Sequence, residues 1–240
     1  MRALRISLIV FGILLVLAVA ADRVAVWIAQ GEVASRARDS LALEAEPDVS
    51  IRGFPFLTQA AGGSLNRVDL GMDDYAAEVG GQSLTVQELD IELNDVELTD
   101  GYSSAVARTA EGEGLVAYEA LTEAYGRLLE VGGTGFGVEF GYAPEGRLSA
   151  TLQASVLGQS IDLGEVVGDI VLEDGAIRLE VNEEDIPDAG GEATREAIRE
   201  QLNEGRELSG LPEGITLESL TPTEDGLALA LTGTDVRFNG

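Results

Sequence analysis

The chain has 240 residues and carries 15 positive side chains, all arginine, against 43 aspartates and glutamates, for a formal net charge of −28. Histidine and cysteine are absent, so the commonest general base and every thiolate ligand are missing. The absence of lysine also excludes a Walker-type phosphate loop. A surface this acidic repels nucleic acid, which is therefore not expected as a partner.

The chain begins with an uncharged apolar run, Ile6 to Ala21, which follows Arg2 and Arg5. Positive charge before such a run predicts a cytoplasmic N-terminus and an exported C-terminal part. As a helix the run would rise about 24 Å, which is short for a hydrocarbon core of about 30 Å. Residues 1–21 are expected to be either a single-pass transmembrane anchor or a signal peptide cleaved after Ala20, and both remain open.

The segment from Asp22 to Leu43 continues the helical pattern, and Glu46-Pro47 is expected to end it. Its apolar side is broad and built largely of small residues, which suits a helix lying in the trough of a sheet. That side comprises Val26, Trp27, Val33, Ala34, Ala37 and Leu41. No repeat or long linker follows, so residues 22–240 are expected to form a single domain.

A short uncharged motif, Gly53-Phe54-Pro55-Phe56-Leu57-Thr58-Gln59, follows the helix. Gly53 permits a positive φ or a close backbone approach, and Pro55 favours extended geometry at Phe54. The motif predicts a stiff, extended corner from which the two rings project. They could fill the core or line a ligand site. Arg67 is the nearest basic residue beyond the motif and is expected to pair with an acid.

Beyond the motif, apolar and polar residues alternate, which predicts half-buried antiparallel strands. An offset at Asn94-Asp95 is typical of a bulge. The alternating sets are Leu89–Leu93, Val96–Leu98, Leu148–Val156, Ile170–Leu172, Ile177–Val181, Leu227–Leu231 and Val236–Phe238. Turns are expected between strands at Pro144–Gly146, Glu173–Gly175 and Glu224–Gly226.

Two further helices are predicted among the strands. One carries a stripe of Tyr118, Leu121, Tyr125 and Leu128, and the other a stripe of Ala197, Ile198 and Leu202. The glycine-rich segment 132–137 follows the first of these helices instead of opening one, so it predicts a helix stop and a bend in a curved sheet, not a nucleotide loop. The acidic segment 182–188 lacks the EF-hand order and is interpreted as a solvated turn, so no metal site is expected.

The order of these features resembles the LmeA-like family of phospholipid-binding proteins of the actinobacterial cell envelope. The resemblance rests on the apolar N-terminus, the helix after it, Val49–Ile51, the motif at 53–59, Gly62-Gly63 and Val68–Leu70. It implies an α+β fold in which a long N-terminal helix is wrapped by a strongly curved, mostly antiparallel sheet, to which the stripes described above add two shorter helices. It also implies an apolar tunnel between helix and sheet, similar to that of the tubular lipid-binding domains.

The resemblance further implies a non-catalytic protein that binds, and could transfer, phospholipid on the outer side of the cytoplasmic membrane, in support of envelope lipid or lipoglycan assembly. No cofactor is expected. With 13 arginines against 43 acids after residue 21, this part carries −30, so capture through acyl chains is expected. The residues expected to contact lipid are Trp27, Phe54, Phe56, Leu57, Leu121 and Tyr125. The alternative is a structural envelope protein with a fully packed core that acts through protein contacts, since alternation indicates a buried face but not what fills it.

Overall fold

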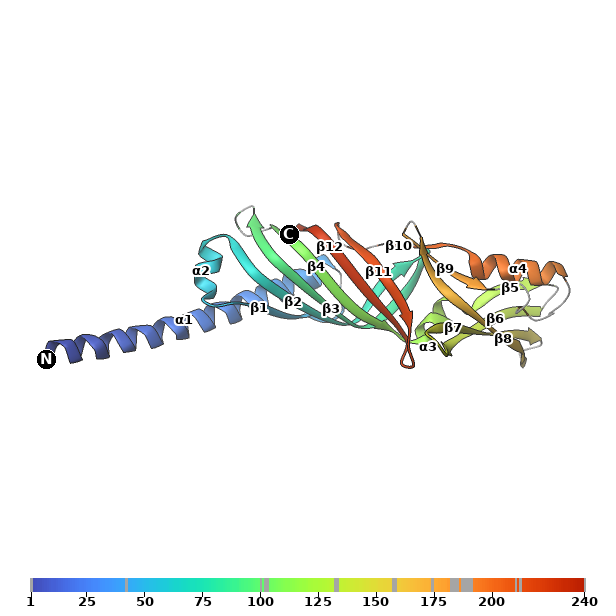
Figure 1. The fold of residues 1–240 in the computed structure, drawn as a ribbon, viewed down its shortest axis with the longest axis horizontal. Coiled ribbons are helices and arrows are strands. Elements are labelled where there is room, and N and C mark those ends of the chain that lie inside the picture. Colours follow the sequence, from blue (N-terminus) through green and yellow to red (C-terminus); the bar gives the residue numbers. More distant parts are fainter. Residues whose placement is uncertain are drawn as a thin grey trace.

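The structure is a computed structural model that describes residues 2–41, 43–99, 101, 104–131, 134–156, 159–173, 175–181, 186, 192–209, 211 and 213–239. Within these residues the chain forms four helices and twelve strands (Figure 1). The α+β fold is the predicted one, with a long N-terminal helix, antiparallel strand pairs and one strongly curled half-barrel. The acidic segment 182–188, apart from Ile186, lies outside the described residues.

Helix α1 (Arg2–Ser40) leaves the strand-rich body as a free rod over its N-terminal half (Figure 1). Of the described helices it is the one that is long and apolar enough to cross a membrane, and the body buries none of its most apolar window. The apolar run from Ile6 and the amphipathic segment from Asp22 therefore form one continuous helix, as the sequence predicted.

The sheet-facing stripe of α1 is narrower than the predicted one. Val26 and Ala34 are buried, whereas Val33 is exposed and Trp27 is 73% exposed. Trp27 lies about 100° around the helix from Val26, which takes it out of the stripe. The expectation that Trp27 faces the sheet is therefore wrong.

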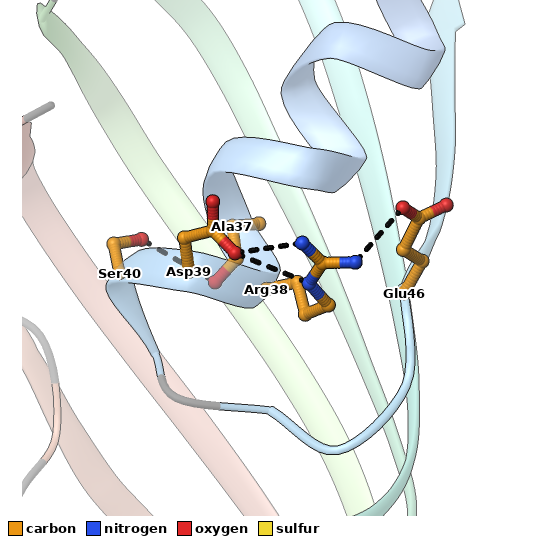
Figure 2. Close-up of polar contacts among 5 residues, drawn as sticks. All are labelled: Ala37, Arg38, Asp39, Ser40 and Glu46. Carbon is orange, nitrogen blue, oxygen red and sulfur yellow. Dashed lines mark hydrogen bonds and ion pairs between the residues drawn. The ribbon is translucent and has the colours of Figure 1, made fainter.

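Helix α1 ends at Ser40, before the predicted end near Pro47, and the chain then turns back toward the first strand. Figure 2 shows the polar contacts around this turn. The Arg38 guanidinium donates to Asp39 Oδ1 at 2.9 and 3.1 Å and to Glu46 Oε1 at 3.2 Å. Arg38 thereby links the last helical turn to the segment that enters the sheet.

The motif at residues 53–59 forms a turn followed by a short helix, α2 (Phe56–Ala61). Gly53 has a φ of +100°, and a side chain there would meet the Gln59 amide at 2.6 Å, so the backbone requires glycine as predicted. Pro55 is extended and precedes the first helical residue. The extended corner is therefore confined to the residues before Phe56, and α2 is a helix that was not expected.

Six of the described strands form what we call the helix-side half-sheet, a half-barrel whose curve encloses the last turns of α1 (Figures 1 and 2). Their order is β11-β12-β4-β3-β2, and β1 pairs with the other edge of β2. Their bounds are β1 (Asp48–Arg52), β2 (Ser64–Val79), β3 (Gln82–Thr99), β4 (Ser104–Val116), β11 (Ile215–Pro222) and β12 (Leu227–Asn239). Val68, Leu93 and Val236 are buried on its inner face, in one cluster with Val26 and Ala34 of α1. The helix thus completes a packed core.

The offset predicted at Asn94-Asp95 is present as a row of irregular positions across four strands. Asp95 has a φ of +50°, and the strand registers on its two sides are the same. The facing residues, which also lie outside the regular pairs, are Asn66, Arg108 and Asp235. Because all four strands are irregular at the same level, the alternation shifts by one residue and both Leu93 and Val96 remain buried.

Five further strands form the distal half-sheet, in the order β9-β8-β7-β6-β5. Their bounds are β5 (Arg127–Val131), β6 (Thr134–Ala143), β7 (Arg147–Val156), β8 (Gln159–Glu173) and β9 (Ala176–Val181). Strand β10 (Arg206–Ser209) joins the two halves by pairing two residues with β2 and two with β9. The three predicted turns all lie between paired strands, and Asp174 of the second turn is outside the described residues.

Helices α3 (Tyr118–Tyr125) and α4 (Glu192–Asn203) are the two shorter helices that the sequence predicted. The predicted stripe is wrong at Leu128, which lies in β5, because Gly126 ends α3. The Gly126 N–H donates to the Thr122 carbonyl at 2.7 Å and its carbonyl accepts from Val138 N–H at 2.7 Å. The glycine-rich segment 132–137 consequently follows a strand and not a helix, and Gly132-Gly133 lies outside the described residues.

Candidate functional site: an apolar cavity between the half-sheets

An apolar cavity of about 110 Å³ lies where the helix-side and distal half-sheets meet. Of the 20 residues that line it, 17 have aliphatic or aromatic side chains. These are Ala77, Val79, Leu84, Val86, Val116, Leu121, Tyr125, Phe140, Leu148, Ile170, Ile177, Leu179, Leu202, Leu217, Leu220, Leu227 and Leu229. They come from both half-sheets and from α3 and α4, so the cavity exists only because the two halves adjoin. A lining of this kind suits hydrocarbon.

Helix α3 is held at the cavity by hydrogen bonds to three other elements. The Tyr118 hydroxyl donates to the β11–β12 turn at 2.7 Å, and the Tyr125 hydroxyl donates to the last carbonyl of β2 at 2.5 Å. Thr122 Oγ1 accepts from a backbone N–H of β6 at 2.9 Å. Burial raises the pKa of both tyrosines, so they remain neutral donors near pH 7. These bonds fix the face of α3 that carries Leu121 into the cavity wall.

Three polar residues complete the lining: Arg178 of β9, Gln201 of α4 and Arg206 of β10. The Arg206 guanidinium lies 4.8 Å from the centroid of the Tyr125 ring, an attractive cation–π contact. Its hydrogen bonds are long, at 3.4 and 3.5 Å to the carbonyls of Glu204 and Gln201. Among the described residues no carboxylate forms an ion pair with it. Most of its N–H donors are therefore available to an anion at the edge of the cavity.

Arg178, the other arginine of the lining, and Arg67, the first arginine after the motif, have acidic partners. Arg178 forms an ion pair with Glu173. Arg67 lies 2.6 Å from Asp69 and 2.7 Å from Glu92, which confirms that it pairs with acids. Burial acts to raise the pKa of Asp69, but hydrogen bonds from Arg67 and Arg52 outweigh it and lower that pKa. These arginines pair with acids, whereas within the described part of the chain Arg206 contacts only carbonyls and the Tyr125 ring.

Three larger hollows, of about 720, 820 and 440 Å³, differ from this cavity in their chemistry. The first two are each lined by seven aspartates and glutamates, and the third by three. A lining rich in carboxylates is costly to cover with hydrocarbon. The smaller apolar cavity is therefore the better candidate for a lipid chain.

Comparison with known protein families assigns the chain to one of them. The model of a family described as LmeA-like phospholipid-binding matches residues 20–232. The chain belongs to the LmeA-like phospholipid-binding family. Neither a curated protein nor a solved structure matches it. The resemblance seen around residues 53–70 is thus confirmed over most of the chain.

In this LmeA-like protein the six residues expected to contact lipid fall into two groups far apart in the fold. Leu121 and Tyr125 line the cavity. Trp27, Phe54 and Leu57 are exposed where α1 leaves the body, and Phe56 is buried beneath them in the helix-side core. The structure brings together only the first pair at the cavity.

The sequence did not point to Arg206, the residue of this LmeA-like site best placed to bind an anion. Its role depends on β10, a four-residue strand too short to show a pattern of its own. The available signal was the pair of tyrosines on α3, since a buried ring beside an arginine favours stacking. That signal does not say which arginine reaches the ring, because nothing local in the sequence relates Tyr125 to position 206.

Proposed function

We propose that this protein binds phospholipid without catalysing a reaction on it, and holds acyl-chain carbon in the apolar cavity between its half-sheets. The observation that carries the proposal is a cavity with 17 apolar lining side chains and one arginine that pairs with no acid among the described residues, in a chain of a phospholipid-binding family. Chain burial contributes about 0.8 kcal/mol per CH₂ removed from water. Arg206 would meet the phosphate, because a guanidinium is a good donor to that group.

The cavity of about 110 Å³ is small beside ligand pockets of about 300–1,000 Å³. Loading an acyl chain therefore requires the wall to open. The narrowest connection is β10, which pairs with each half-sheet through only two residues. Separation of the half-sheets at β10 would widen the cavity and move Arg206 with its edge.

We place the body on the outer side of the cytoplasmic membrane, with α1 as its anchor. Arg2 and Arg5 before the apolar run favour this orientation. The helix continues unbroken past Ala20, which favours the anchor over a cleaved signal. Phospholipid held beside that membrane would serve envelope lipid or lipoglycan assembly as a carrier.

Native mass spectrometry of the full chain, purified from membranes in mild detergent, tests the proposal. We expect a bound phospholipid on the wild-type protein and severalfold less on Ala77→Leu, which fills the cavity. Ala107→Leu is the matched control, because Ala107 is fully buried in the helix-side core and does not line the cavity. A lipid-free wild-type protein, or equal loading of the two variants, would contradict the proposal and favour a structural protein with a packed core.

A further inference from the structure

Five large apolar side chains are exposed where α1 leaves the body. Three lie on one side of α1 within little more than one turn, the other two lie in the motif beside it, and we call the five the collar. The collar comprises Val24 (57% exposed), Trp27 (73%), Ile28 (60%), Phe54 (61%) and Leu57 (47%). After residue 21, eight large hydrophobic residues are exposed in the part of the chain that the structure describes. More than half of them gather here, and such clustering marks a contact surface.

Two charged residues adjoin the collar, Asp22 and Arg23, and they neutralise each other. Asp22 is 3% exposed, and its carboxylate lies 2.5 Å from the Arg23 guanidinium and accepts the Leu57 N–H at 2.8 Å. The same guanidinium lies over the Phe54 ring, 5.3 Å from its centroid. The acid that ends the apolar run is thus paired and turned inward against α2. Its charge is therefore no barrier to a less polar surrounding.

The collar also lengthens the part of α1 that can lie within a membrane. The uncharged run of 16 residues from Ile6 to Ala21 would rise about 24 Å, less than a hydrocarbon core of about 30 Å. Once Asp22 and Arg23 are compensated, apolar surface extends to Ile28, and a helix from Ile6 to Ile28 rises about 34 Å. That length spans the core and reaches the interfacial layer beyond it.

We propose that the collar is embedded in the interfacial layer of the bilayer that α1 crosses, so that the body is seated on the lipid surface and does not hang free above it. This inference rests on the proposed anchor. α2 lies beside α1 at the end of the body from which the helix projects (Figure 1), so the collar continues the apolar rod directly. Tryptophan favours the interface because its ring is apolar and its N–H is polar. The contact is apolar, which suits a body whose charge of −30 would be repelled by anionic headgroups.

The single tryptophan of the chain makes this measurable in the full-length protein, reconstituted in vesicles of phosphatidylcholine and phosphatidylglycerol. We expect Trp27 emission to be quenched by lipids brominated near the headgroup, and its acrylamide quenching constant to be at least about threefold lower than that of a water-exposed tryptophan. Phe54→Ser with Leu57→Ser should raise that constant toward the exposed value. Trp27 that is open to acrylamide and unaffected by brominated lipid would overturn the proposal.

The control moves the tryptophan to the other end of the body, with Trp27→Phe and Ile161→Trp together. Ile161 is 56% exposed in β8, in the half-sheet remote from α1 (Figure 1). This variant should be quenched by acrylamide and not by brominated lipid. Quenching by brominated lipid at both positions would mean that the body lies flat on the membrane, which contradicts a seat at the collar. A carbonate wash tests the anchor separately. If α1 does not anchor the protein, the wash releases it from the vesicles, whatever the quenching shows.

Discussion

The strands of the helix-side and distal half-sheets share an alternation of apolar and polar residues, but different elements pack against their buried faces. In the helix-side half the last turns of α1 lie within the curve, and Val26 and Ala34 pack with the strands into one core. At the junction with the distal half, the helices that meet the strands are, among those described, the short α3 and α4, and a cavity of about 110 Å³ remains. Alternation buries a face in both places, but the element opposite that face decides whether it is packed or can accept a ligand.

The largest effect is expected on the packed side of this comparison, at the motif. Phe56→Ala should lower the free energy of unfolding by about 3–5 kcal/mol, because it leaves a hole in the core. Phe54→Ala should change it by no more than about 0.5 kcal/mol, since that ring is 61% exposed. Urea unfolding of the full chain in detergent measures both. Equal losses for the two variants would mean that the ends of the motif are not divided between core and surface.

On the cavity side, Arg206→Gln should weaken phospholipid binding about 10-fold or more, because a charged hydrogen bond contributes about 1.5–3 kcal/mol. The unfolding free energy should change little. Arg67→Gln is the matched control, since Arg67 already pairs with Asp69 and Glu92. Titration of the delipidated protein with vesicles gives both affinities. A greater loss for Arg67→Gln would move the phosphate contact to the outer face of the helix-side half.

The stabilities of the two alanine-to-leucine variants compare the packing of the helix-side core with that of the junction. Ala107→Leu should cost about 1–3 kcal/mol, because it overpacks a residue with no exposed surface. Ala77→Leu should cost less than about 1 kcal/mol, since the added methyl groups enter the cavity. Thermal melts of both variants without lipid provide the test. If Ala77→Leu were the more damaging, the junction would have to be as tightly packed as the helix-side core.

The smallest effect is a pH dependence in the helix-side half. Arg67 and Arg52 lower the pKa of Asp69 in the folded protein. Its contribution to stability is therefore present above its unfolded pKa of about 4 and is lost as pH falls through the lower folded pKa. Asp69→Asn should flatten the decline of the melting temperature below about pH 4. A wild-type and a variant curve that remain parallel down to about pH 2 would exclude this role.

Much of the fold could be predicted because its signals are local. Val49–Ile51, the β7 alternation from Leu148 and the turn at Pro144–Gly146 all lie where the sequence placed them. The helix end at Gly126 was missed because it depends on a contact with Val138 N–H in another strand. The exposure of Trp27 was missed because small residues make the apolar face of α1 broad, and only the sheet selects which side of it is covered.

The site was less predictable than the fold. Leu121 and Tyr125 followed from a helical stripe, but the same stripe included Leu128, which belongs to β5. The cavity itself arises from the meeting of two half-sheets through β10, which pairs Leu208 with Val79 of β2 and Arg206 with Ile177 of β9, far outside any local window. No window of sequence carries that information.

Photo-crosslinking with a phospholipid that carries a diazirine in its acyl chain tests the central claim most directly. The full chain would be loaded with this lipid, irradiated and mapped by peptide mass spectrometry. The account predicts adducts on α3, β8 and β9, around Leu121, Ile170 and Ile177, and their loss in Ala77→Leu. Adducts confined to the inner face of the helix-side half, around Val68 and Leu93, would contradict it and place the lipid between α1 and the sheet.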